Sequence, residues 1–139
     1  METSLVRRRL TETIERARKH AAEHRGRADQ ASRDFEVFLQ KVAIPLVRQV
    51  ANALRADSYA FSVFTPAGSV RLMSDRAAED YIEISLDTAG DPPRVMGRVS
   101  RTRGHRVIDA ERAIGAPEAL TEDDVLEFLM TELESFVER

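Results

Sequence analysis

The hydrophobic pattern of the first 56 residues predicts helix. From Leu10 onward, apolar or small side chains recur in alternating steps of four and three, with His24 as the polar member of the series. A spacing of 3.5 residues held over more than four heptads is typical of a helix that packs along another helix. The positions in this stripe are Leu10, Ile14, Ala17, Ala21, His24, Ala28, Ala31, Phe35, Phe38 and Val42.

Two residues of this segment could interrupt the helix. Gly26 could turn it into a helical hairpin, but the stripe keeps its register across Gly26, which favours a continuous helix. Pro45 lacks a backbone N–H and its ring clashes with the preceding turn. We therefore expect a kink near Ile44 and a second helical segment from Pro45 to about Ala56. At the start of the chain, Thr3 or Ser4 would suit the N-cap.

The stripe changes along its length, and this change predicts two roles for the helix. Between Ala17 and Ala31 it is narrow and rich in alanine, whereas from Phe35 the apolar face widens as expected for core. The first half should therefore protrude as an arm. The charges beside the stripe do not pair as a parallel coiled coil requires, so an antiparallel partner fits better. The predicted oligomer interface consists of Leu10, Ile14, Ala17, Ala21, Ala28 and Ala31.

After Ala56 the period changes from that of a helix to that of strands. Alternating apolar residues predict strands at 58–64, 70–74, 81–86, 94–100 and 106–114, joined by short turns. Short connections favour antiparallel neighbours, so a meander of four to five strands is expected. Thr121 and Asp124 resemble a capping box that opens a C-terminal amphipathic helix. Its expected apolar stripe is Leu126, Leu129, Met130, Leu133 and Val137.

These elements predict one α+β domain. Residues 1–56 supply the helical arm and a core helix, and residues 57–139 supply the sheet and the last helix. The chain has no cysteine, no signal-peptide pattern and no apolar run near the roughly 20 residues that a bilayer requires. We therefore expect a cytoplasmic protein that does not enter a membrane.

The formal net charge of −3 hides an asymmetry between the two parts. Residues 1–56 carry 12 basic and 7 acidic side chains, a net of +5, while residues 57–139 carry 9 basic and 17 acidic ones, a net of −8. This division predicts that one part meets a polyanion, or that the two parts meet each other across subunits.

Two constellations could bind a ligand. His20 and His24 lie four apart on one helical face around Glu23, in the order found in some zinc peptidases. A third ligand is missing from this helix, and the remaining histidine, His105, falls in a predicted turn, so solvated side chains are the simpler interpretation. Arginines at the predicted hairpin end could bind an anion or phosphate, although pairing with the protein's own acids is favoured. These are Arg98, Arg101, Arg103 and Arg106.

No nucleophile elbow, Walker loop or dinucleotide-binding glycine motif occurs in the chain, and we predict no catalytic residue and no cofactor. The leading hypothesis is a non-enzymatic protein–protein interaction or adaptor module that self-associates, most simply as a homodimer, through its N-terminal helix and also holds another protein. One alternative is a nucleic-acid-binding regulator that uses the basic arm and the Arg98–Arg106 hairpin. Another is a small enzyme with a site in a cleft that the sequence does not identify.

Overall fold

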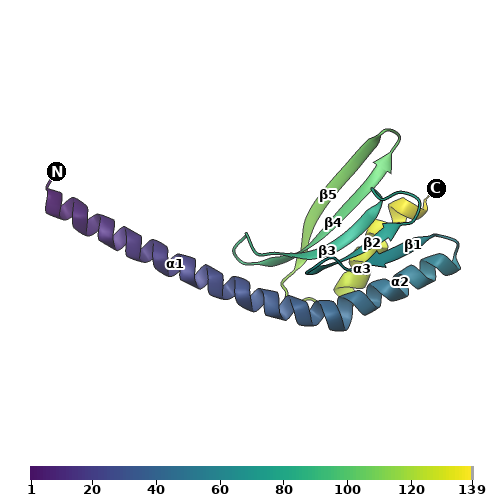
Figure 1. Cartoon of the computed structure of the whole chain (residues 1–139), viewed down its shortest axis with the longest axis horizontal. Helices are drawn as coiled ribbons and strands as arrows, with labels where there is room; N and C mark the ends of the chain where they lie inside the picture. Colours follow the sequence, from purple (N-terminus) through teal and green to yellow (C-terminus); the bar gives the residue numbers. More distant parts are fainter. Residues whose placement is uncertain (139) are drawn as a thin grey trace.

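The computed structural model describes residues 1–138 and has an α+β architecture. A long helical segment precedes a five-stranded antiparallel sheet, and a single helix follows the sheet (Figure 1). The predicted fold class is confirmed.

The helical segment continues from Thr3 to Ala56 without a hairpin. Helix α1 (Thr3–Phe38) passes directly through Gly26, leads into a π-helical turn (η1, Leu39–Ala43), and continues as α2 (Ile44–Ala56). The predicted N-cap is wrong, because α1 begins after Glu2 and no side chain caps it.

The expected kink lies next to Pro45, but its form was not predicted. The wider π-helical turn ends at Ala43, directly before α2, which carries Pro45 in its first turn. A π-helical turn shifts the backbone hydrogen bonds from i→i+4 to i→i+5 just before Pro45, which has no N–H to donate. Such turns are a recognised site of helix bending. The change of direction between α1 and α2 is visible in Figure 1.

The sheet is a meander in which each strand pairs with its sequence neighbours, in the order β1-β2-β3-β4-β5. Its strands are β1 (Phe61–Phe64), β2 (Ser69–Ser74), β3 (Tyr81–Asp87), β4 (Arg94–Arg103) and β5 (Arg106–Gly115). The β4–β5 hairpin is longer than the pattern predicted, because the two strands stay paired as far as Arg103 and Arg106. Gly104 adopts a positive φ of 61° and allows the tight turn that joins these two residues.

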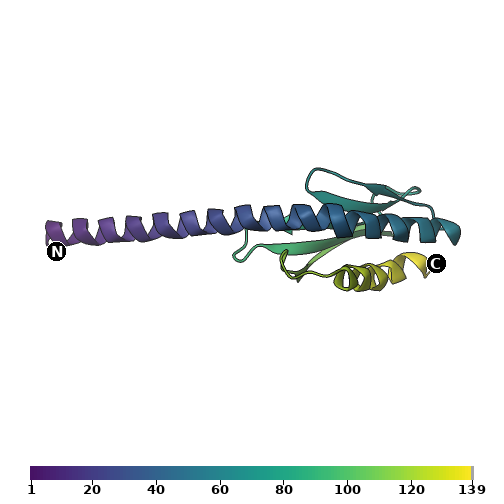
Figure 2. The ribbon, with the colours of Figure 1, turned by 90° about the horizontal axis from the view of Figure 1, so that it is seen from below.

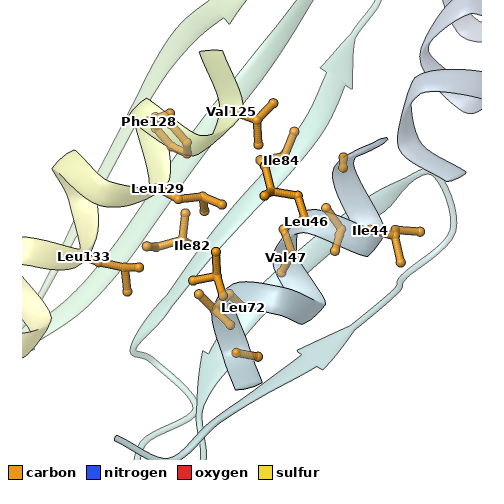
Figure 3. Packing of buried hydrophobic residues seen from close by; sticks show 14 of the residues in the cluster. Ile44, Leu46, Val47, Leu72, Ile82, Ile84, Val125, Phe128, Leu129 and Leu133 are labelled. Atoms are coloured by element: carbon orange, nitrogen blue, oxygen red, sulfur yellow. The ribbon is translucent and has the colours of Figure 1, made fainter. Parts of the chain in front are cut away.

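Two helices cover the same face of this sheet. Helix α2 contacts β1 and β2, and α3 (Glu122–Val137) contacts β4 and β5. Viewed from below, the two helices lie side by side (Figure 2). Between them and the sheet lies one hydrophobic core that takes residues from every part of the chain after the arm; Figure 3 labels Ile44, Leu46, Val47, Leu72, Ile82, Ile84, Val125, Phe128, Leu129 and Leu133.

The start of α3 is fixed by the predicted capping box. The Asp124 N–H donates to the Thr121 hydroxyl at 3.2 Å, and the Thr121 N–H donates to the Asp124 carboxylate at 3.0 Å. This carboxylate therefore has a pKa below its ordinary value, because both the backbone and the side chain of Thr121 favour its charged form.

The opposite face of the sheet carries polar pairs. The Arg71 Nε–H donates to Glu83 at 2.9 Å across β2 and β3, and the Arg71 guanidinium lies 4.0 Å from the centre of the Tyr81 ring. Opposite charges on adjacent strands and a cation over an aromatic ring are both compatible with water. This face can therefore stay uncovered.

Close contact between α3 and β4 depends on Gly97. A Cβ atom at this position would lie 2.3 Å from Cζ of Phe128, which is buried. Arg112, opposite Gly97 on β5, places its guanidinium 4.9 Å from the centre of the same ring. Phe128 is thus held against the backbone of β4, and no larger residue than glycine fits beneath it.

We expect Gly97→Ala to lower the free energy of unfolding by about 1–3 kcal/mol, because Phe128 must move away from the sheet. Urea denaturation followed by circular dichroism measures this change. The matched control is Gly26→Ala, where nothing lies within 4 Å of the added methyl group. Alanine is favoured over glycine in a helix by about 0.8–1 kcal/mol, so the control should make arm amides exchange more slowly. Equal stability of Gly97→Ala and the wild-type chain would contradict this account of the α3 contact.

Candidate functional site

The most conspicuous surface is the N-terminal part of α1, residues 3–26, which we call the arm. It projects away from the sheet and from the other helices in both views (Figures 1 and 2). Every residue of the arm is exposed except His24, which is partly buried. At about 1.5 Å per residue, its 24 residues extend roughly 36 Å.

The arm presents an apolar stripe to solvent. Val6, Leu10 and Ile14 are spaced four residues apart on one face, and their exposed fractions are 48%, 56% and 40%. Ala17 and Ala21 continue the stripe toward the body and are also exposed, whereas Ala28 is partly buried. Ala31, the last residue of the predicted interface, is already buried within the single chain, so it is not free to meet a partner.

The charges of the arm are arranged around this stripe. At about 100° per residue, Arg7 and Arg18 flank the stripe on one side, and Arg9 and Arg16 flank it on the other. The opposite face carries the three acidic residues of the arm, Glu12, Glu15 and Glu23, together with Arg8 and Lys19. The arm therefore shows an outward apolar stripe with basic borders.

The base of the arm is attached to the body by an ion pair. Two guanidinium nitrogens of Arg27, Nε and a terminal nitrogen, donate to the two carboxylate oxygens of Asp91 at 3.0 and 2.6 Å. Asp91 lies in the loop before β4, and Pro92 and Pro93 of that loop line a hollow together with Ala31. These contacts are the point at which the free helix becomes part of the folded body.

This ion pair changes the pKa of its carboxylate. The hydrogen bonds from Arg27 hold the pKa of Asp91 below its ordinary value of 3.8, and the electrostatic interactions of this carboxylate with Arg27 and His24 act in the same direction. The carboxylate is therefore charged at neutral pH. The pair weakens only as the pH falls through the lowered pKa.

His20 and His24 lie on the arm, four residues apart as the sequence indicates. His24 is partly buried near the Arg27–Asp91 pair, and His20 is exposed. Within residues 1–138, no group of three or more His, Cys, Asp or Glu side chains is placed to hold a metal ion. His105, the possible third ligand, follows Gly104 in the β4–β5 turn.

The four arginines of the β4–β5 hairpin do not form one cluster. Arg98 donates to Asp109 on β5 at 3.1 and 2.7 Å, and this hydrogen bonding raises the pKa of Arg98 and lowers that of Asp109. Because side chains alternate along a strand, Arg98 lies on the opposite face from Arg101 and Arg103. Arg106 is directly opposite Arg103 and shares its face. The sequence interpretation that these arginines pair with the protein's own acids is confirmed for Arg98.

A groove between α2 and α3 is the surface that the sequence did not predict. Its volume is about 760 Å³, and most of its lining is apolar. Leu126 and Met130, which were expected in the buried stripe of α3, line it instead and remain 37% and 48% exposed. The residues that line it are Leu46, Gln49, Val50, Ala53, Leu54, Asp57, Tyr59, Glu122, Leu126, Met130, Leu133, Glu134 and Val137.

One sequence signal could have indicated the groove. Helix α3 buries Val125, Phe128, Leu129 and Phe136 against the sheet, yet Leu126, Met130 and Val137 lie about a third of a turn away. This apolar surface is wider than a helix covered on one side requires. The ionisable side chains that line the groove are Asp57, Tyr59, Glu122 and Glu134.

None of the helices within residues 1–138 combines the length and apolar character needed to cross a bilayer. Comparison of the chain with protein-family models, with curated proteins and with solved structures finds no match. Function is therefore inferred from the surfaces described above.

The ion pair at the base of the arm predicts a specific titration. In carboxylate NMR spectra, Asp91 and Asp109 should both titrate below 3.8. Arg27→Ala should raise the pKa of Asp91 toward that value, because its main hydrogen-bond donor is gone. Asp109 keeps Arg98 and serves as the internal control. A pKa of Asp91 that stays unchanged in Arg27→Ala would show that the pair does not form.

Proposed function

We propose that this protein is a non-enzymatic interaction module that self-associates, most simply as a homodimer, through its N-terminal helix. The observation that carries the proposal is the exposed stripe of Val6, Leu10 and Ile14 on an arm that projects from the body. Aliphatic side chains at helical spacing on a free helix are a recurring means of helix-mediated recognition.

The energetics of an isolated helix support a partner for the arm. Short helices are marginal in water, and most helical stability in proteins comes from packing of an apolar face. Residues 3–26 have no such packing within the single chain, and Gly26 weakens the helix further. A partner that covers Leu10 and Ile14 would supply the missing stabilisation, at roughly 1.5–3 kcal/mol for each side chain that becomes fully buried.

The second part of the proposal is that the assembled protein holds another protein. The polar face of the sheet and the acidic surface of α3 remain open in the single chain, and the latter carries six acidic residues and no basic one between Glu122 and Val137. Surfaces of one charge sign favour partners of the opposite sign.

Self-association through the arm is tested by placing charge in the stripe. We expect Leu10→Glu with Ile14→Glu to raise the dimer dissociation constant by about a hundredfold, since two buried aliphatic contacts are lost. Light scattering over a dilution series measures this change. The matched control, Arg8→Gln with Lys19→Gln, lowers the net charge of the arm by the same two units at exposed positions opposite the stripe and should leave the dimer nearly unchanged. A wild-type chain that stays monomeric at every concentration would overturn the proposal.

A nucleic-acid-binding regulator is the second candidate function, and the shared face of Arg101, Arg103 and Arg106 favours it. If these three side chains bind phosphates, affinity for a mixed-sequence duplex should fall as salt is added. In a plot of the logarithm of the binding constant against the logarithm of the salt concentration, each phosphate contact contributes about −0.9 to the slope. Fluorescence anisotropy of the wild-type chain and of Arg101→Ala with Arg103→Ala measures this slope. The absence of binding at low salt removes this candidate.

A further inference from the structure

The groove between α2 and α3 offers an apolar site of helical dimensions. Helix α2 contributes Leu46, Val50, Ala53 and Leu54 to it, and α3 contributes Leu126, Met130, Leu133 and Val137. The two helices contact opposite halves of the sheet, and the channel is lined by side chains of both. Along α2 the lining runs from Leu46 to Asp57, about 17 Å of helix.

The edges of the groove are acidic. Glu122 and Glu134 line it from α3, and Asp57 lines it where α2 ends. None of the ion pairs recorded among residues 1–138 involves these three carboxylates. A cationic helix that entered the groove would therefore find carboxylates at its edges that are free to pair.

The arm has the complementary pattern. Its stripe of Val6, Leu10 and Ile14 spans about 12 Å, which fits within the length of the groove. Arg7 and Arg18 on one border of the stripe would face Glu122 and Glu134 on the α3 side of the groove while the aliphatic side chains enter the channel. We propose that the arm of a second copy of this chain docks in the groove between α2 and α3. This inference rests on the self-association proposed above and names the surface that the arm contacts.

A chain's own arm is excluded from its own groove by the continuity of the helix. Residues 3–56 form one helical segment from the tip of the arm to the end of α2, so the arm points away from the groove that α2 lines (Figure 1). The arm would have to break and fold back to reach it. The occupant is therefore another molecule.

Charge also favours docking in the groove over pairing of two arms. Two arms that meet along their stripes bring the basic borders of both helices together, and like charges at these positions are unfavourable. The acidic edges of the groove reverse the sign of this interaction. The same arm residues should thus repel another arm and attract the groove.

Charge reversal separates these two modes of association. Arg7→Glu with Arg18→Glu should raise the dissociation constant about tenfold or more if the arm enters the groove. If two arms pair antiparallel instead, the same changes should leave the dimer about as stable, because each border then faces its own copy and like charges meet before and after the reversal. Combining them with Glu122→Arg and Glu134→Arg in the groove should restore association, and light scattering of the wild-type chain and of both variants measures it.

A second pair of variants tests the channel itself. Met130→Lys places a charge inside the groove at a side chain that is already 48% exposed, and we expect it to weaken the dimer about tenfold or more. Thr131→Lys adds the same charge at the neighbouring exposed position outside the lining and is the matched control. Unfolding by urea confirms that both variants are folded.

The possible results are distinguishable. A dimer that persists both with Met130→Lys and with Arg7→Glu and Arg18→Glu overturns docking in the groove but leaves self-association through the arm intact. A wild-type chain that is monomeric at all concentrations overturns both. Weakening by each change, with recovery when the charges are exchanged, supports the arm in the groove.

The absence of cysteine allows a direct check of contact. Copies that carry only Leu10→Cys and copies that carry only Met130→Cys are mixed and treated with a short bifunctional thiol reagent. A mixed product between the two species is expected, and it should diminish when Arg7→Glu and Arg18→Glu are added to the Leu10→Cys chain. Products that contain only Leu10→Cys copies would instead indicate paired arms.

Discussion

The continuity of the helix from Thr3 to Ala56 constrains the rest of the structure. Its last third is fixed in the core by residues such as Leu39 and Val47, which pack against the inner face of the sheet. The π-helical turn before Pro45 sets the bend, and the Arg27–Asp91 pair holds the helix to the body at one further point. On the N-terminal side of Arg27, no residue of the helix is buried within the single chain. The direction of the arm is therefore set by the part of the helix that packs in the core.

The body is built so that only one side of the sheet requires cover. Alternation along the strands places Val70, Leu72, Ile82 and Ile84 beneath α2 and α3 and leaves paired charges on the other side. Phe128 contacts the backbone at Gly97 and brings α3 close to β4. Helix α2 lies over β1 and β2 instead, and an apolar groove remains between the two helices.

The arm and the groove have matching properties although they lie far apart in the chain. One is an apolar stripe with arginine borders, and the other is an apolar channel with carboxylates at its edges. The positive charge of residues 1–56 thus includes the arginine borders of the arm, and the negative charge of residues 57–139 includes the carboxylates of the groove. By contrast, the hairpin arginines are distributed over two faces of a strand pair, and Arg98 is already paired with Asp109. The basic cluster of the sequence is therefore divided in the structure, with Arg101, Arg103 and Arg106 on one face and Arg98 on the other.

The sequence alone determined the elements whose signals are local. The 3.5-residue stripe predicted the long helix, alternation predicted the strands, and Thr121 with Asp124 predicted the start of α3. Tertiary structure decided what depends on distant partners: the π-helical turn, the burial of Ala31, the division of the arginines, and the groove to which Leu126 and Met130 contribute. Periodicity shows which side chains share a face, because backbone geometry fixes it. Whether that face is covered depends on how far apart the packed elements lie, and only the assembled core sets that distance.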